Sequence, residues 1–209
     1  MIREFYEWVN FWWENAPNIE ADRILVIGDS ITNGYRSILQ KNLNENNILV
    51  DMTVGSRSVE DPALEAEFKY VMGTANNFKY KLIQFNNGLH GAHLSVNEYE
   101  AGIRKHVQII KELQPQAVIL LATSTPYTPK NSEGTINLIK NKQVIERNEI
   151  LKKLSSELCL PLNDLFYSIA GKSEYPQPDE VHFTSAGYEY LAKITADIIK
   201  SVLKSNNYI

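Results

Sequence analysis

Short apolar runs alternate with longer segments of helical periodicity along most of the chain. The runs, rich in β-branched residues, cover residues 23–28, 48–54, 81–85, 117–122 and, more weakly, 158–162. Helical spacing covers about residues 35–44, 62–74, 96–113, 138–157 and 185–204. Strands that are apolar on both faces and joined by helices belong in a parallel sheet with helices on both sides. The pattern therefore predicts an α/β fold, a three-layer αβα sandwich around a five-stranded parallel sheet.

No stretch rich in Pro, Gly or Ser divides the 209 residues, so we expect a single domain over residues 1–209. Before the first run, apolar residues recur at helical spacing at Phe5, Trp8, Val9 and Trp12. They predict an aromatic-rich helix at about residues 3–15, packed on the body of the protein. Tyr6 and Trp13 would then point elsewhere, free to cap a pocket, stack on a sugar ring or meet a second subunit.

Charge and cysteine content exclude several classes of function. A net charge of −4 with 22% charged residues gives no basic stripe, so we expect neither nucleic acid nor a membrane as partner. The lone Cys159, between two leucines, is interpreted as a buried, inert thiol. No apolar run reaches the length of a membrane span, and charges interrupt the N-terminal aromatics. We expect a cytoplasmic protein, although a chain whose leader had been removed would look the same.

Candidate chemistry begins where the first run ends, at Gly28-Asp29-Ser30. A strand that enters a helix through this turn brings the Ser30 hydroxyl to the carboxyl edge of the sheet, beside free N–H groups of the helix. Asp and Ser are also common helix caps, which is the alternative interpretation. Near the other end, Asp179 and His182 supply a carboxylate and an imidazole that can complete a triad with Ser30, or else only terminate a loop.

Four ordered blocks make the chain resemble the SGNH or GDSL hydrolases, which are serine esterases and acylhydrolases. The blocks are Gly28 to Ile31, Val54-Gly55-Ser56, residues 86–91, and Asp179 to His182. The resemblance implies the flavodoxin-like strand order 2-1-3-4-5. It also implies Ser30 as nucleophile, His182 as acid and base, Asp179 as the residue that orients His182, and no cofactor.

The third block departs from the family pattern GxND. Its alignment with Gly88-Leu89-His90-Gly91 places His90 where the family has its oxyanion-hole asparagine, with Asn87 as runner-up. The resemblance implies backbone N–H groups of Ser30 and Gly55 as the other donors, and Asp29 and Asn87 as substrate-binding residues. In the implied strand order, Ser30 and His90 follow the two strands that flank the switch point, where ligands bind in such sheets.

Other kinds of site are disfavoured. His90, His93 and Asp179 form no recognised zinc pattern, and the segment Gly28 to Gly34 lacks the Lys of a phosphate loop and the glycines of a dinucleotide site. We therefore expect no metal. Residues 124–134, rich in Pro and Gly, form a long loop that is either a pocket wall or a plain connection.

The chain is thus interpreted as a serine hydrolase that cleaves a small ester through an acyl-enzyme. No apolar lid is evident, which favours a short acyl group, and a carbohydrate acetyl ester is the first substrate to test. Two alternatives remain open: a catalytically weak carbohydrate-binding module on the same fold, and an acyltransferase with the same triad.

Overall fold

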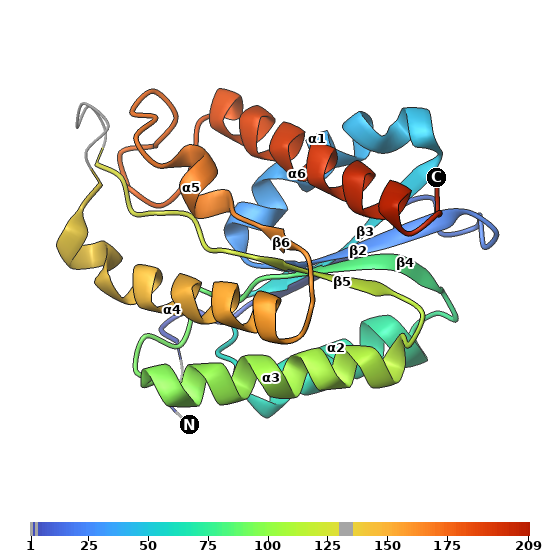
Figure 1. Ribbon diagram of the computed structural model, residues 1–209, viewed down its shortest axis with the longest axis horizontal. Helices are drawn as coiled ribbons and strands as arrows, with labels where there is room; N and C mark the ends of the chain where they lie inside the picture. The colour runs from blue at the N-terminus through green and yellow to red at the C-terminus, as the bar shows by residue number, and fades with distance from the viewer. Residues whose placement is uncertain (1, 3, 130–135) are drawn as a thin grey trace.

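A computed structural model describes residues 2, 4–129 and 136–209, in which a six-stranded sheet lies between two layers of helices (Figure 1). The strand order is β1-β3-β2-β4-β5-β6. Strands β2 to β6 are parallel, and β1 pairs antiparallel with β3. The mainly parallel α/β fold and the 2-1-3-4-5 order of the five expected strands are confirmed. The bounds are β1 Val9–Trp12, β2 Asp22–Gly28, β3 Ile48–Gly55, β4 Tyr80–Phe85, β5 Val118–Ala122 and β6 Leu162–Asn163.

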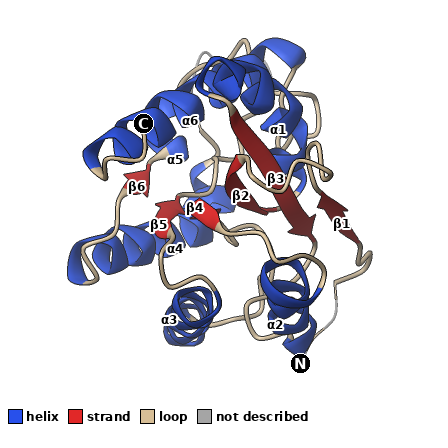
Figure 2. Cartoon of the chain, turned by 90° about the vertical axis from the view of Figure 1, so that its right-hand side faces the viewer, coloured by secondary structure: helices blue, strands red, loops and turns tan. Residues whose placement is uncertain are grey.

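Helices cover both faces of the sheet (Figure 2). On one face lie α1 Ser30–Leu43, α5 Leu165–Ile169 and α6 Ser185–Ser205. On the other lie α2 Pro62–Lys69, α3 Val96–Leu113 and α4 Leu138–Glu157. A 3₁₀ turn, Asn44–Asn46, follows α1, and a π-helical turn, Tyr70–Thr74, follows α2. Polar side chains set the helix starts, as in the capping box in which Ser95 and Glu98 begin α3.

The central strand β2 contributes side chains to the core on both faces of the sheet. Ile24 and Val26 contact the cluster under α1 and α6, whereas Leu25 and Ile27 contact the cluster under α2, α3 and α4. Successive side chains of a strand point to opposite faces, and both faces are covered here. This is why the strand appears in the sequence as an uninterrupted apolar run.

The predicted N-terminal helix over residues 3–15 is wrong. Residues 9–12 form the edge strand β1, whose backbone pairs with β3 from Val9 opposite Gly55 to Trp12 opposite Met52. Phe11 and Trp13 pack against the core with stacked rings, while Trp12 between them is 49% exposed. Side chains here alternate between the core and solvent with the two-residue period of a strand. The pairing also gives hydrogen-bond partners to the N–H and C=O groups at the edge of β3. Edge pairing thus overrides the helical spacing.

Two expectations near residue 160 also need correction. The fifth parallel strand is short and begins at Leu162, because residues 158–160 turn from α4 toward the sheet. Leu158 and Leu160 pack against the core, but Cys159 between them has φ 52° and is exposed. A left-handed residue in a tight turn directs its side chain away from those of its neighbours, so the thiol is not buried. Within the described residues, no helix combines the length and apolar character needed to cross a membrane.

A buried ion pair ties the segment between β1 and β2 to the sheet. Arg23 Nη1 donates to both oxygens of Asp51 at 2.7 and 2.9 Å, and Nη2 donates to the carbonyls of Asn15 and Asn18. Asp51 also accepts from the Glu14 N–H and from the Tyr80 hydroxyl. Since both charges are excluded from water, removal of either leaves the other buried without its partner.

We expect Arg23→Met to lower the free energy of unfolding by about 3–5 kcal/mol, the usual cost of breaking a buried pair from one side. Urea denaturation followed by circular dichroism measures this. Lys193→Met is the control: Lys193 pairs with Asp197 at 3.4 Å on the exposed face of α6, so about 1 kcal/mol or less should be lost. Equal losses in the two variants would contradict the assignment.

Candidate active site

Ser30 is the first residue of α1, directly after β2. Asp29 is in an extended conformation and caps the helix, because its Oδ1 accepts from the Ile31 N–H at 2.9 Å. A Cβ on Gly28 would lie 2.1 Å from Thr32 Oγ1, so only glycine allows the strand to enter the helix this closely. The cap and the glycine together hold the Ser30 hydroxyl at the carboxyl edge of the sheet.

Asp179 and His182 lie in the loop between α5 and α6, and this loop is held by its own hydrogen bonds. Asp179 Oδ1 accepts from the N–H groups of Val181 and His182 at 3.0 and 2.9 Å. The Gln177 N–H donates to the His182 carbonyl at 2.8 Å. Phe183 is buried in the core beneath α6. The position of His182 is therefore set from both sides along the chain.

The structure brings Ser30, His182 and Asp179 together. His182 Nε2 lies 2.9 Å from Ser30 Oγ, and Nδ1 lies 2.8 Å from Asp179 Oδ2. In this order, a carboxylate holds one ring nitrogen and the other faces a hydroxyl. Such a chain can remove the proton from the serine oxygen and return it to a leaving group.

The hydrogen bonds of Asp179 govern its charge. Burial raises the pKa of this carboxyl, but the hydrogen bonds from the backbone N–H groups of His182 and Val181 and from the imidazole outweigh it, so the net pKa is lowered. Asp179 therefore stays ionised at neutral pH. An ionised carboxylate on Nδ1 keeps the proton there and leaves Nε2 as the acceptor for Ser30.

Gly55 ends β3 next to the site, with a negative φ, so its role is close approach rather than a left-handed turn. A Cβ there would lie 2.6 Å from the carbonyl oxygen of Trp8, the residue just before β1. The Ser56 N–H donates to that same oxygen. Because N–H groups alternate sides along a strand, the Gly55 N–H is directed away from β1 and toward the β2 side.

The asparagines after β4 are engaged by the scaffold. Asn86 Nδ2 donates to the Ala122 carbonyl and to Ser124 Oγ. Asn87 Nδ2 donates to the Arg57 carbonyl at 2.7 Å, and its Oδ1 is buried with no hydrogen-bond partner among the described residues. Asp29, the other residue expected to bind substrate, is 2% exposed and serves as the cap of α1.

The histidines other than His182 occupy three different settings. His90 is partly exposed, with Nδ1 3.8 Å from Glu4 Oε1, and no hydrogen bond among the described residues links it to Ser30 or His182. His93 Nε2 lies 2.6 Å from Glu60 Oε1. His106 is buried, and burial lowers its pKa. In the part of the chain that the structure describes, no three His, Cys, Asp or Glu side chains are grouped so as to hold a metal ion.

A cleft of about 380 Å³ opens beside Asp179, and of the three residues Ser30, His182 and Asp179 only Asp179 is among those that line it. Its lining mixes apolar and polar residues. The apolar ones are Leu89, Ala92, Val144 and Val181, the polar ones are Tyr127, Lys140, Gln143 and Asp179, and Gly88 completes the lining. Lys140 Nζ also pairs with Glu180 at 2.7 Å, which links α4 to the loop that carries His182. The cleft can hold a small molecule with both apolar and polar groups.

Sequence reasoning found only part of this lining. Tyr127 lies in the loop that was considered as a pocket wall, while residues 130–134 of that loop are outside the described residues. Lys140 and Gln143 on α4 were missed. Their three-residue spacing places them on one helix face, but a polar pair on a helix normally indicates a face exposed to solvent.

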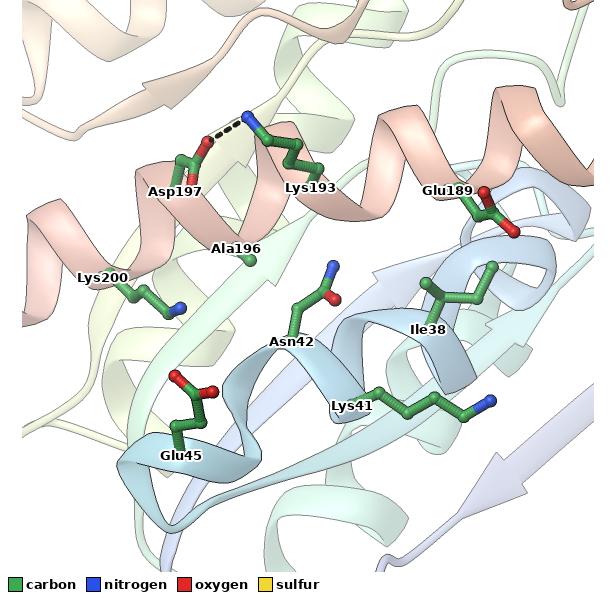
Figure 3. Close-up of a pocket in the computed structure, with 9 residues that line it drawn as sticks. All are labelled: Ile38, Lys41, Asn42, Glu45, Glu189, Lys193, Ala196, Asp197 and Lys200. Atoms are coloured by element: carbon green, nitrogen blue, oxygen red, sulfur yellow. Dashed lines mark hydrogen bonds and ion pairs between the residues drawn. The ribbon is translucent and has the colours of Figure 1, made fainter.

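A separate hollow of about 610 Å³ lies between α1 and α6 (Figure 3). Charges of both signs line it, including Lys41, Glu45, Glu189 and Lys200. Ser30, Asp179 and His182 are not among its residues. Mixed charges without a buried polar group are typical of a solvated surface groove, so this hollow is not assigned to the site.

Comparisons with known proteins agree with the geometry of the fold. No protein-family model matches the sequence, and no curated protein matches it either. Solved structures do match: the aryl esterase of M. smegmatis has a TM-score of 0.69 at 19% identity, over 88% of this chain and 100% of that one. The chain has the fold of the SGNH hydrolases.

Two further structural neighbours carry other descriptions. A variant of an acetyl-xylooligosaccharide esterase from Geobacillus has a TM-score of 0.67 at 20% identity, over 85% of this chain and 94% of that one. A lipase/acylhydrolase from Enterococcus faecalis has a TM-score of 0.65 at 17% identity, over 87% and 96%. At these identities the likeness establishes the fold.

We expect Asp179→Asn to lower kcat for ester cleavage by about a thousandfold or more, because an amide no longer fixes the tautomer of His182 or stabilises its charged form. Steady-state kinetics on p-nitrophenyl acetate measure this. Asp197→Asn, an exposed change on α6, is the control and should leave kcat unchanged. A loss below tenfold in a folded Asp179→Asn variant would contradict the role of this carboxylate.

Proposed function

We propose that the protein is a serine hydrolase that cleaves a short-chain carboxylic ester through an acyl-enzyme. One observation carries the proposal: the continuous hydrogen-bonded chain from Ser30 Oγ through His182 to Asp179 Oδ2 at the carboxyl edge of the sheet. The esterases and acylhydrolases among the structural neighbours support it.

The arrangement accounts for each proton in the reaction. His182 Nε2 takes the proton of Ser30 as its oxygen attacks the ester carbonyl carbon, and the imidazolium then gives that proton to the departing alcohol. Water attacks the acyl-enzyme in the second half, with His182 again as base, and releases the acid and free Ser30. Asp179 keeps its charge throughout and stabilises the imidazolium.

The tetrahedral intermediate needs hydrogen-bond donors for its negatively charged oxygen. We assign the backbone N–H of Ser30, which as the first residue of α1 has no intrahelical partner, and the N–H of Gly55. His90 is the proposed side-chain donor. The engagement of the Asn87 amide by the Arg57 carbonyl makes Asn87 the less favoured alternative.

Features of the cleft support a small, polar substrate. Its volume of about 380 Å³ suits a short acyl group and part of a sugar, and Tyr127, Lys140 and Gln143 offer hydrogen bonds to hydroxyl groups. Two neighbours are described as an acetyl xylan esterase and an acetyl-xylooligosaccharide esterase. We therefore propose an acetylated carbohydrate as the substrate class.

Ser30→Ala should abolish ester cleavage and leave the fold intact, because the methyl group retains no nucleophile. Hydrolysis of p-nitrophenyl acetate, butyrate and octanoate, and of acetylated xylo-oligosaccharides, measures the loss and the acyl preference. Ser37→Ala, an exposed change on the same helix, is the matched control and should remain fully active. Mass spectrometry after a fluorophosphonate probe should locate the label on Ser30. Retained turnover in Ser30→Ala, or wild-type protein with neither turnover nor label, would overturn the proposal.

His90→Ala should lower kcat about a hundredfold to a thousandfold with a small change in KM, since a lost oxyanion donor costs about 3 kcal/mol of barrier. His90→Asn restores a donor and should recover most of the rate. The Asn87→Ala variant is measured alongside under the same conditions. A loss in Asn87→Ala together with full activity in His90→Ala would move the donor to Asn87.

A further inference from the structure

Arg147 of α4 is a buried cation whose partners are carbonyl groups. Its side chain is among the largest that the fold buries completely, with 2% of the residue exposed. In the part of the chain that the structure describes, no carboxylate lies within ion-pair distance of it. Nη1 donates to the carbonyls of Gly88 and His90 at 3.0 and 2.8 Å, and Nη2 donates to the carbonyl of Gly91 at 2.5 Å.

The three carbonyls belong to one short loop, residues 88–91, which follows β4 at the switch point of the sheet. Gly88 and Leu89 of this loop line the same cleft as Asp179 and Val181. The guanidinium thus lies beneath the wall of the cleft, on the side of α4 and the core. It also lies over the ring of Tyr99, with Cζ 4.6 Å from the ring centroid.

Other contacts anchor the same loop at single points. Glu4 Oε1 accepts from the Gly91 N–H at 2.8 Å. Gly91 has φ 72°, which few other residues tolerate, and a Cβ on Gly88 would lie 1.4 Å from Ser124 Oγ. Arg147 alone spans the loop from Gly88 to Gly91 among the hydrogen bonds given by the described residues.

Desolvation of a guanidinium is expensive, and the partners that offset it among the described residues are neutral: three carbonyls and the Tyr99 ring. Burial accordingly lowers the pKa of Arg147. An apolar side chain at this position of α4 would avoid that cost. A planar fork with several donors has the geometry to hold three carbonyls in one fixed arrangement, which a lysine ammonium lacks.

We propose that Arg147 is a positioning residue for ester cleavage: it fixes residues 88–91, and with them the cleft wall and His90, relative to Ser30. This inference rests on the proposed function. Arg147 acts on the reaction through the loop and does not touch the substrate. A variant that loosens the loop should therefore lower kcat more than it raises KM.

The kinetic test compares Arg147→Met and Arg147→Lys with wild type on p-nitrophenyl acetate. We expect kcat to fall tenfold or more in Arg147→Met with KM changed less than threefold, and Arg147→Lys to be intermediate. Lys153→Met, an exposed change on the same helix, is the matched control and should keep full kcat.

A thermal unfolding curve confirms that each variant is folded at the assay temperature. A folded Arg147→Met or Arg147→Lys variant with kcat within twofold of wild type overturns the proposal. If Arg147→Met does not fold, Arg147→Lys decides.

Hydrogen exchange separates this inference from the proposed function, because it does not depend on turnover. Amides in peptides covering residues 86–95 should exchange at least tenfold faster in Arg147→Lys than in wild type, while peptides from β2 and α6 remain unchanged. Unchanged exchange at residues 86–95 overturns the positioning role whatever the activity. Faster exchange there in a protein whose wild type cleaves no ester and takes no fluorophosphonate label would keep the loop-fixing role and remove only the catalytic one.

Discussion

The pairing of β2 between β3 and β4 is the constraint on which the site depends. The chain leaves β2 for α1 on one face and returns to β3 on one side, whereas the later crossover through α2 enters β4 on the other side. The segments that follow β2 and β4 therefore diverge at the carboxyl edge, as they do at any switch point of a parallel sheet. Ser30 follows one strand and residues 86–91 follow the other, so the space between them is a consequence of strand order.

Asp179 and His182 reach the space between these two segments from outside the sheet. Both lie on a loop outside the sheet, and their position depends on the hydrogen bonds that Asp179 accepts within the loop, the Gln177 hydrogen bond and the buried Phe183. The imidazole is 37% exposed and the carboxylate 50%, so the site is open to water on this side. Ser30 at the start of α1 thus meets a histidine that is held by its own loop, on a side of the molecule that water reaches.

Local signals were strong enough to predict most of the framework. The apolar runs predicted β2 to β5 close to their observed positions because both faces of the sheet are covered. The Gly28-Asp29-Ser30 turn indicated the start of α1 because a glycine allows the close strand-to-helix turn and a carboxylate caps the first N–H groups of the helix. The N-terminal strand was missed because the edge of β3, rather than the periodicity of residues 5–12, decides its conformation. The contribution of α4 was missed for a related reason: nothing in the spacing of Lys140, Gln143 and Arg147 distinguishes a cleft wall from a solvated helix face.

The hydrogen bond between Ser30 and His182 joins residues 152 positions apart in the chain. Strands β3 to β6 lie between these two residues in the chain, and Phe183 and α6, which follow His182, pack in the core cluster on the α1 face of the sheet. During synthesis, Ser30 therefore precedes His182 by 152 residues, and a nascent chain that ends between them cannot form this contact. The contact between Ser30 and His182 is thus a product of the tertiary fold and of neither segment alone.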